Sequence, residues 1–239
     1  MNVRREEILR ELGLTPLWRS RASVAATLPA NERHTNVVAP VGADDRRAQI
    51  LRMDWPQLKV SVAGCTACPL HQTRTHTVFG VGDENADWLL VGEGPGAEED
   101  AKGEPFVGPA GQLLDNMLAA IKLKRGQNVY IANVVKCRPP DNRNPEHEET
   151  QQCESYLARQ IELIKPRLIV VLGKVAAQNL LHTDATVASL RGKLHQYQGI
   201  PLIVTYHPAY LLRSLSDKSK AWQDLCLATT TMQALQSAK

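Results

Sequence analysis

Four short apolar runs alternate with segments of helical periodicity, and this alternation strongly limits the folds open to the chain. The runs cover residues 88–91, 129–135, 168–172 and 200–206. Each is nearly continuous in apolar residues, which is typical of parallel strands buried on both faces. Helical segments are expected at 112–124, 145–164, 174–181 and 218–235. The pattern predicts an α/β fold in which a parallel sheet lies between two layers of helices.

The stretch Asp87–Ala110, DWLLVGEGPGAEEDAKGEPFVGPA, contains the first of these runs and is the strongest candidate for a site. Its apolar start is followed by GEGPG, which predicts a tight loop directly after the strand. Ligands of open parallel sheets bind beyond the carboxyl ends of the strands. Only 5% of the residues are aromatic, so a phenylalanine between prolines and glycines, Phe106, also points to this stretch.

A nucleotide-binding fold is the main rival interpretation of this loop. Gly92, Gly94 and Ala97 satisfy the spacing G-x-G-x-x-A after a strand, which is typical of dinucleotide-binding folds. However, Pro95 and three acidic residues follow where a helix N-terminus is needed, and acidic side chains repel a pyrophosphate. We therefore do not expect a nucleotide site here.

Composition excludes some classes of protein. No apolar run approaches transmembrane length, and the N-terminus carries charged residues where a signal peptide needs an apolar core. We therefore expect a cytoplasmic protein without a membrane partner, and no feature demands more than a monomer. A formal net charge of +3 permits a nucleic-acid partner without arguing strongly for one.

The cysteines suggest a metal centre. Cys65 and Cys68 form C-x2-C before a proline, while Cys137 follows the second strand and Cys153 lies near the start of the next helix. In this architecture all four can converge on one end of the sheet. Their spacing alone does not separate a zinc site from an iron–sulfur cluster, because both take four cysteines. Cys226, between two leucines, fits an ordinary buried thiol.

Several motifs together resemble one family. They are CTACPL, VGEGPGAEED, GEPFVGPAGQLLD, YIANVVKCRPPDNRNP, Cys153 and TYHPAYLLR, and they occur in order across residues 65–213. This set is similar to the family 4 uracil-DNA glycosylases, the iron–sulfur members of the uracil-DNA glycosylase superfamily. The resemblance implies a three-layer α/β/α sandwich with a central four-stranded parallel sheet. It also implies a [4Fe-4S] cluster on Cys65, Cys68, Cys137 and Cys153, and hydrolysis of the N-glycosidic bond of deoxyuridine in DNA.

The same resemblance implies how the base is bound. The enzyme must extrude uracil from the duplex, and Phe106 would provide the face on which the flipped ring stacks. The amide of Asn133 would donate to uracil O4 and accept from N3–H, whereas cytosine presents the reverse pattern. Glu99 would lie near C5 and crowd the methyl group of thymine, and the backbone around Gly94 would approach the base. Taken alone, Asn133 could equally cap a turn, and the acidic residues could form a solvated turn.

Two residues are the candidates for catalysis. His207, directly after the fourth strand, would donate to uracil O2 as the leaving group becomes anionic. Glu93 would position the attacking water and stabilise positive charge on the sugar. Members of the superfamily differ at this carboxylate, so a role for Glu93 as general base stays open.

DNA contacts are also expected from residues outside the base pocket. The HPAYLLR segment would enter the minor groove, with Leu211 and Leu212 filling the gap left by the base and Arg213 beside them. The expected phosphate contacts are Arg138, Arg143, Lys218 and Lys220, although any of them could be plain surface charge.

The N-terminal region lies outside these motifs. Residues 1–20 predict a short amphipathic helical peptide, residues 21–43 a flexible linker and residues 44–239 the glycosylase domain. The first segment resembles the N-terminal peptide of the psi subunit of the bacterial clamp loader, which implies a clamp-loader partner. The alternative function is therefore a replisome accessory module on a glycosylase-like scaffold.

Overall fold

The computed structural model describes residues 43–237. The expected helical peptide at 1–20 and nearly all of the expected linker at 21–43 lie outside the described residues. None of the helices between residues 43 and 237 is long and apolar enough to cross a membrane.

A single six-stranded sheet forms the centre of the fold, in the order β1-β3-β2-β4-β6-β5. Neighbouring strands among β3, β2, β4 and β6 pair in parallel, whereas β1 and β5 pair antiparallel at the two edges. The strands are β1 (Val81–Gly82), β2 (Trp88–Gly92), β3 (Val129–Asn133), β4 (Leu168–Leu172), β5 (Leu194–Tyr197) and β6 (Ile200–Thr205). The α/β class is therefore confirmed.

The sequence pattern did not predict the two edge strands, so the sheet has six strands rather than four. β1 is only two residues long. β5, LHQY, exposes most of its side chains and carries little apolar signal. Neither strand has the buried, continuous apolar run by which the other strands were found.

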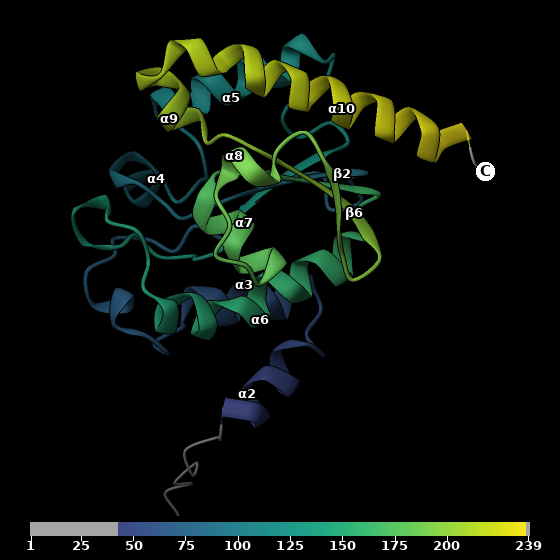
Figure 1. Ribbon diagram of the computed structural model, residues 1–239. Helices are drawn as coiled ribbons and strands as arrows, with labels where there is room; N and C mark the ends of the chain where they lie inside the picture. The colour runs from purple at the N-terminus through teal and green to yellow at the C-terminus, as the bar shows by residue number, and fades with distance from the viewer. Residues whose placement is uncertain (1–42, 238–239) are drawn as a thin grey trace, which may run out of the picture. The chain divides into compact units, whose positions relative to one another are not determined.

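Helices cover both faces of the sheet (Figure 1). One face packs against α5 and α10, and the other against α3, α6 and α7. The helices are α2 (Ala43–Ile50), α3 (Trp55–Ala63), α4 (Ala97–Lys102), α5 (Pro109–Ala120), α6 (His147–Ile164), α7 (Lys174–Leu181), α8 (Val187–Leu190), α9 (Pro208–Arg213) and α10 (Lys218–Ser237), with 3₁₀ turns η1 (Pro69–Gln72), η2 (Pro140–Asn142) and η3 (Leu215–Asp217).

The continuous apolar runs are explained by these two cores. In β2, Leu89 and Val91 join the core beneath α3, α6 and α7, whereas Trp88 and Leu90 join the core beneath α5 and α10. Successive side chains of a strand point to opposite faces, so a strand covered on both sides must be apolar at every position.

The acidic stretch after β2 forms a helix that the sequence pattern did not predict. α4 begins directly after Gly96, and the Glu99 carboxylate accepts a hydrogen bond from the Gly96 N–H at 3.1 Å. Acidic side chains are favourable in a first helical turn because of the helix dipole. The expectation that no helix N-terminus follows this loop was therefore wrong. The acidic side chains of α4 still oppose the binding of a pyrophosphate there.

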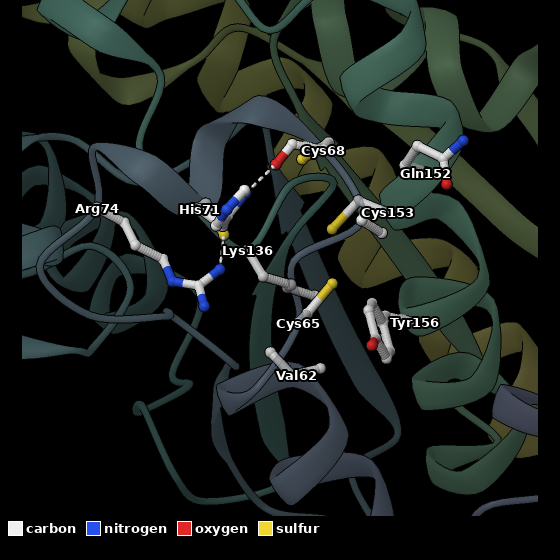
Figure 2. A pocket seen from close by; sticks show the side chains of 11 residues that line it. Val62, Cys65, Cys68, His71, Arg74, Lys136, Gln152, Cys153 and Tyr156 are labelled. Atoms are coloured by element: carbon white, nitrogen blue, oxygen red, sulfur yellow. Dashed lines mark hydrogen bonds between the residues drawn. The ribbon is translucent and has the colours of Figure 1, made fainter. Parts of the chain in front are cut away.

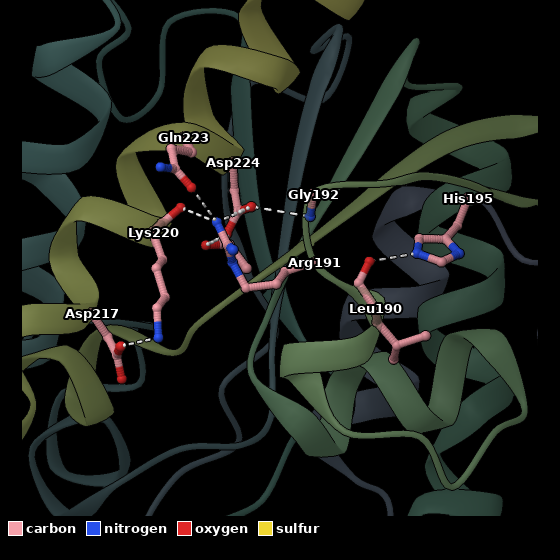
Figure 3. Close-up of polar contacts among 9 residues, drawn as sticks. Leu190, Arg191, Gly192, His195, Asp217, Lys220, Gln223 and Asp224 are labelled. Atoms are coloured by element: carbon pink, nitrogen blue, oxygen red, sulfur yellow. Dashed lines mark hydrogen bonds and ion pairs between the residues drawn. The ribbon is translucent and has the colours of Figure 1, made fainter.

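A buried carboxylate joins α10 to the sheet. The Asp224 side chain is 0% exposed. It accepts hydrogen bonds from Arg191 Nε at 3.1 Å, Gly192 N at 3.2 Å and Thr205 Oγ1 at 2.9 Å. Figure 3 shows Arg191 and Gly192 meeting Asp224 from the segment after α8. One side chain thus holds α10, β6 and this segment together.

We expect Asp224→Ala to destabilise the fold by about 3 kcal/mol, because breaking a buried ion pair leaves its partner groups unsatisfied. Gln223→Ala is the matched control. Gln223 also contacts Arg191, at 3.2 Å, but is exposed, so its loss should cost less than about 0.5 kcal/mol. Urea unfolding measures both values, and equal effects would show that Asp224 does not hold the fold in this way.

Candidate functional site

The carboxyl ends of the four parallel strands lie together at one end of the sheet. Gly92 pairs in register with Asn133, and Leu172 pairs with Thr205, so β2, β3, β4 and β6 end side by side. The loops that follow line a cavity of about 530 Å³. This is where ligands bind in open α/β sheets.

Most of the site residues predicted from the sequence lie around this one cavity. Those that line it are Glu93, Gly94, Glu99, Phe106, Asn133, Arg143, His207 and Arg213. They come from segments far apart in the sequence, and the sheet topology brings them together. Arg138, Leu211 and Leu212 do not line it.

Asn133 supplies an unsatisfied acceptor. It ends β3 and is 2% exposed. Within residues 43–237, its Oδ1 is the single buried side-chain nitrogen or oxygen without a hydrogen-bond partner. A Cβ on Gly92 would lie 2.5 Å from this oxygen, so only glycine leaves room for the amide there. Because an orphaned buried acceptor costs free energy, it points to a ligand that donates a hydrogen bond.

Phe106 provides an aromatic wall beside this amide. Its ring is stacked with the His207 ring at 5.5 Å between centroids and 30° between planes. The residue is 6% exposed and adopts φ 55°, in the left-handed region that is uncommon for a side chain of this size. Such backbone strain persists where the surrounding structure enforces it, and it clusters at functional sites.

The Glu99 carboxylate holds the loops that form one wall of the cavity. Oε1 accepts hydrogen bonds from Val107 N at 2.9 Å and Gly108 N at 3.1 Å, and Oε2 accepts one from Gly96 N. The carboxylate is therefore committed to backbone donors and fixes the shape of the cavity wall.

Burial changes the ionisation of the two candidate catalytic groups. Desolvation raises the pKa of Glu93 to about 6, so its carboxylate is mostly ionised at neutral pH. Desolvation lowers the pKa of His207 to about 4, so its imidazole is neutral there. The His207 Nδ1 accepts a hydrogen bond from Ala209 N at 3.1 Å, so the neutral ring carries its proton on Nε2. The ring can therefore donate one hydrogen bond without carrying a charge.

The cationic residues at the cavity differ in their surroundings. Arg143 forms two hydrogen bonds with the Glu149 carboxylate, at 2.7 and 2.8 Å, which fix its guanidinium in the loop before α6. Arg213 and Lys174 are exposed at the cavity. Lys174 was not predicted from the sequence, although its position two residues after the third apolar run was the available signal. Arg138 is half-buried outside the cavity and donates from Nε to Asn142 Oδ1 at 2.7 Å.

The expectation that Leu211 contacts DNA is wrong for this structure. Leu211 is 1% exposed and packs in a core cluster with Met117, Ala221 and Leu225. The first turn of α9 directs this side chain toward α5 and α10. Leu212 is 42% exposed, so of the two leucines only Leu212 is accessible to a partner.

Four cysteines line a second cavity, near α3 and α6. Its walls include Cys65, Cys68, Cys137 and Cys153. Figure 2 shows the Cys65 and Cys153 sulfurs directed into the same space. Cys226 is exposed elsewhere, which corrects the expectation that it is a buried thiol.

Basic side chains surround this cysteine cavity. Arg74 Nη1 donates to Cys137 Sγ at 3.0 Å, and Arg46 Nη2 donates to Cys65 Sγ at 3.5 Å. Lys136 also lines the cavity and is 1% exposed, with its ammonium bonded to Asn133 O at 2.8 Å and to Gln160 Oε1 at 2.6 Å. Buried charges need compensation, and both bonded partners of this ammonium are neutral. An anionic centre carried by the cysteines would supply the missing negative charge.

The cysteine cavity has a donor set suited to a metal centre. Among residues 43–237, no group of three or more His, Cys, Asp or Glu side chains is arranged to hold one metal ion. A zinc ion draws four sulfurs to within about 2.3 Å of one atom, whereas a cubane cluster is larger and is held by four separated thiolates. Four cysteines around one cavity, with arginine donors to the sulfurs of Cys65 and Cys137, match the four thiolates that such a cluster requires.

Comparison with known proteins defines the class. The sequence model of the uracil DNA glycosylase superfamily matches residues 79–226. This span includes the six strands and every residue that lines the cavity at the strand ends.

Individual relatives indicate which family within the superfamily the chain belongs to. The type-4 uracil-DNA glycosylase of Archaeoglobus fulgidus is 48% identical over 159 residues, which cover 63% of this chain and 79% of the relative. That of Pyrobaculum aerophilum is 42% identical over 183 residues, 73% of this chain and 93% of the relative. The type-5 uracil-DNA glycosylase of the same organism is 33% identical over 148 residues, 54% of this chain and 64% of the relative. The chain therefore belongs to the uracil-DNA glycosylase superfamily and, within it, to the type-4 family.

The cysteine cavity predicts the metal content of the protein. Anaerobically purified protein should contain about four iron atoms per chain, and Cys137→Ala should lose most of them because a ligand is missing. Cys226→Ala is the matched control, since this thiol lies outside the cavity, and it should keep the full iron content. Elemental analysis measures the iron and zinc content per chain. One zinc per chain without iron would contradict an iron–sulfur centre at these cysteines.

Proposed function

We propose that this member of the superfamily is a hydrolase that removes uracil from DNA. The enzyme would cleave the N-glycosidic bond of an extruded deoxyuridine and leave an abasic site, which is the first step of base excision repair. The observation that carries the proposal is the orphaned Asn133 Oδ1 in a cavity beside Phe106. The family relationship supports the same function.

The cavity suits uracil by its hydrogen-bond pattern. Uracil N3–H would donate to the Asn133 Oδ1, and the amide nitrogen would donate to O4. Cytosine presents an acceptor at N3 and a donor at N4, so each of these contacts would be repulsive. The flipped ring would stack on Phe106, and this contact offsets part of the cost of unstacking the base.

Thymine differs from uracil by a methyl group on C5. We infer that Glu99 excludes it by fixing the wall of the cavity, because its carboxylate is bound to the N–H groups of Gly96, Val107 and Gly108. A wall held by three hydrogen bonds yields little space to an added methyl group. The backbone at Gly94 would complete the contact with the base.

Catalysis would use Glu93 and His207, the two groups whose pKa values are shifted by burial. The neutral His207 would donate from Nε2 to uracil O2 as negative charge develops on the leaving base. The Glu93 carboxylate would orient the attacking water and stabilise positive charge on the sugar. Their ionisation states at neutral pH, carboxylate and neutral imidazole, support these roles.

DNA would approach across the mouth of the cavity. Arg213 and Lys174, both exposed there, would contact phosphates, with Arg143 and Arg138 as further candidates. The exposed Leu212 would fill the gap left by the extruded base.

The four cysteines of the second cavity, Cys65, Cys68, Cys137 and Cys153, would hold a [4Fe-4S] cluster. Bound there, the cluster supplies a cross-link between the segments that carry its ligands. Residues 137–153 form the segment between two of these ligands, and this segment carries Arg143. Its anchoring would therefore fix one side of the DNA-binding surface.

The alternative function, a replisome accessory module with a clamp-loader partner, gains no support. The named relatives are glycosylases, and the N-terminal peptide lies outside the described residues. The monomeric state and the cytoplasmic location stay predictions.

Excision assays with Asn133→Ala test the proposal. On oligonucleotides with a single uracil, we expect kcat/KM to fall by about 100-fold or more, as it does when a hydrogen-bonding group of an active site is removed. Asn179→Ala, on α7 outside this cavity, should match the parent protein. Neither the parent protein nor either variant should excise thymine or cytosine from matched oligonucleotides. Full activity of Asn133→Ala would refute the assignment.

The pH profile tests Glu93 separately. Because its raised pKa in the free protein is about 6, the carboxylate is protonated as the pH falls through this value, and kcat/KM should fall about tenfold per pH unit below it. His207, with a lowered pKa of about 4, stays neutral over this range and should not contribute. Glu93→Gln should be slower and should lack this acid limb. An unchanged limb in Glu93→Gln would assign it to another group.

A further inference from the structure

We propose that Arg125 is a positioning residue of the base pocket, which holds the ring of Phe106 in place through the backbone. Arg125 does not line the cavity and lies in the turn after α5. The proposal rests on the proposed role of Phe106 as the stacking wall for uracil.

The Arg125 guanidinium binds the carbonyl groups of the two peptide bonds that flank Phe106. Nη1 donates to the carbonyl oxygen of Pro105 at 2.8 Å, and Nη2 donates to the carbonyl oxygen of Phe106 at 2.7 Å. Nε donates to the Asp115 carboxylate at 3.0 Å, which orients the guanidinium from α5. The planar fork of arginine suits two neighbouring acceptors, which a lysine cannot serve in the same way.

Phe106 needs such support because its backbone is strained and its surroundings are crowded. A φ of 55° places it in the left-handed region, and the residue is buried. The first turn of α5 packs directly on it, since a Cβ on Gly111 would lie 1.8 Å from the Phe106 carbonyl oxygen. The strand pairing of the sheet does not include this segment, so its carbonyl groups depend on Arg125 for hydrogen bonds.

The segment 105–108 is thus held from two directions. Arg125 binds the carbonyl oxygens of its first half, and Glu99 binds the N–H groups of its second half, at Val107 and Gly108. Between these contacts the backbone has little freedom, and the ring stays against His207. Without Arg125 the strained residue can relax toward negative φ, and the ring would turn away from the position where a base stacks.

The positioning of the Phe106 ring by Arg125 is tested by the inhibition constant of free uracil. The kcat and KM values on a uracil-containing oligonucleotide are measured beside it. Arg125→Met should weaken uracil inhibition about tenfold, a part of what loss of a base–aromatic stack costs. Arg125→Lys keeps a cationic donor but lacks the planar fork, so its uracil inhibition should lie between that of Arg125→Met and that of the parent protein.

Arg159→Met is the matched control. Arg159 is also a half-buried arginine, which donates from Nε to a backbone carbonyl, that of Met53, at 2.7 Å, and from Nη1 to Glu162 at 2.9 Å. It lies on α6, away from the cavity. Both Met variants should lower the melting temperature, but Arg159→Met should leave uracil inhibition within about twofold of the parent. Equal weakening in both variants would reduce Arg125 to a general stabilising residue and overturn the proposal.

A double-mutant cycle tests whether Arg125 acts through the ring. In a Phe106→Leu background, Arg125→Met should change uracil inhibition by less than about twofold, because the ring that it positions is gone. A full tenfold effect in this background would overturn the proposal. If Phe106→Leu alone leaves uracil inhibition unchanged, the stacking role in the proposed function fails instead, and the two failures are distinguished.

Discussion

The parallel pairing of β3, β2, β4 and β6 is the constraint on which the site depends. The carboxyl ends of parallel strands lie at the same end of the sheet, so residues far apart in the sequence come close together there without long loops. Asn133 ends one of these strands, while Glu93 and His207 follow closely after two others. The helices on both faces bury the sheet and keep these strand ends rigid, which a hydrogen-bonding pocket requires.

Burial then determines what these groups can do. The same desolvation raises the pKa of Glu93 and lowers that of His207, so one group keeps a usable negative charge and the other stays a neutral donor. It also makes the unpartnered oxygen of Asn133 costly. A ligand that donates to this oxygen removes the cost, and a ligand that presents an acceptor increases it. In the proposed function, recognition and catalysis both depend on the burial of these groups around one cavity.

The sequence predicted those features that have a local signature. Continuous apolar runs revealed the central strands because both faces of the sheet are covered, and motif residues after these runs located the cavity. Features that depend on tertiary packing were missed or wrong. Leu211 is buried because α9 packs on α5 and α10, which a leucine pair in a motif does not reveal. Arg125 carries no motif signal, since it binds backbone carbonyl groups, and the edge strands β1 and β5 lack a buried apolar run.

The central claim is that the orphaned amide oxygen of Asn133 receives the N3–H of uracil beside the ring of Phe106. A crystal structure of the protein with free uracil tests it most directly. The account predicts uracil in the cavity at the strand ends, with N3 about 2.9 Å from Asn133 Oδ1 and the base stacked on Phe106. Uracil bound at another place, or in this cavity with N3 turned away from Asn133, would contradict it.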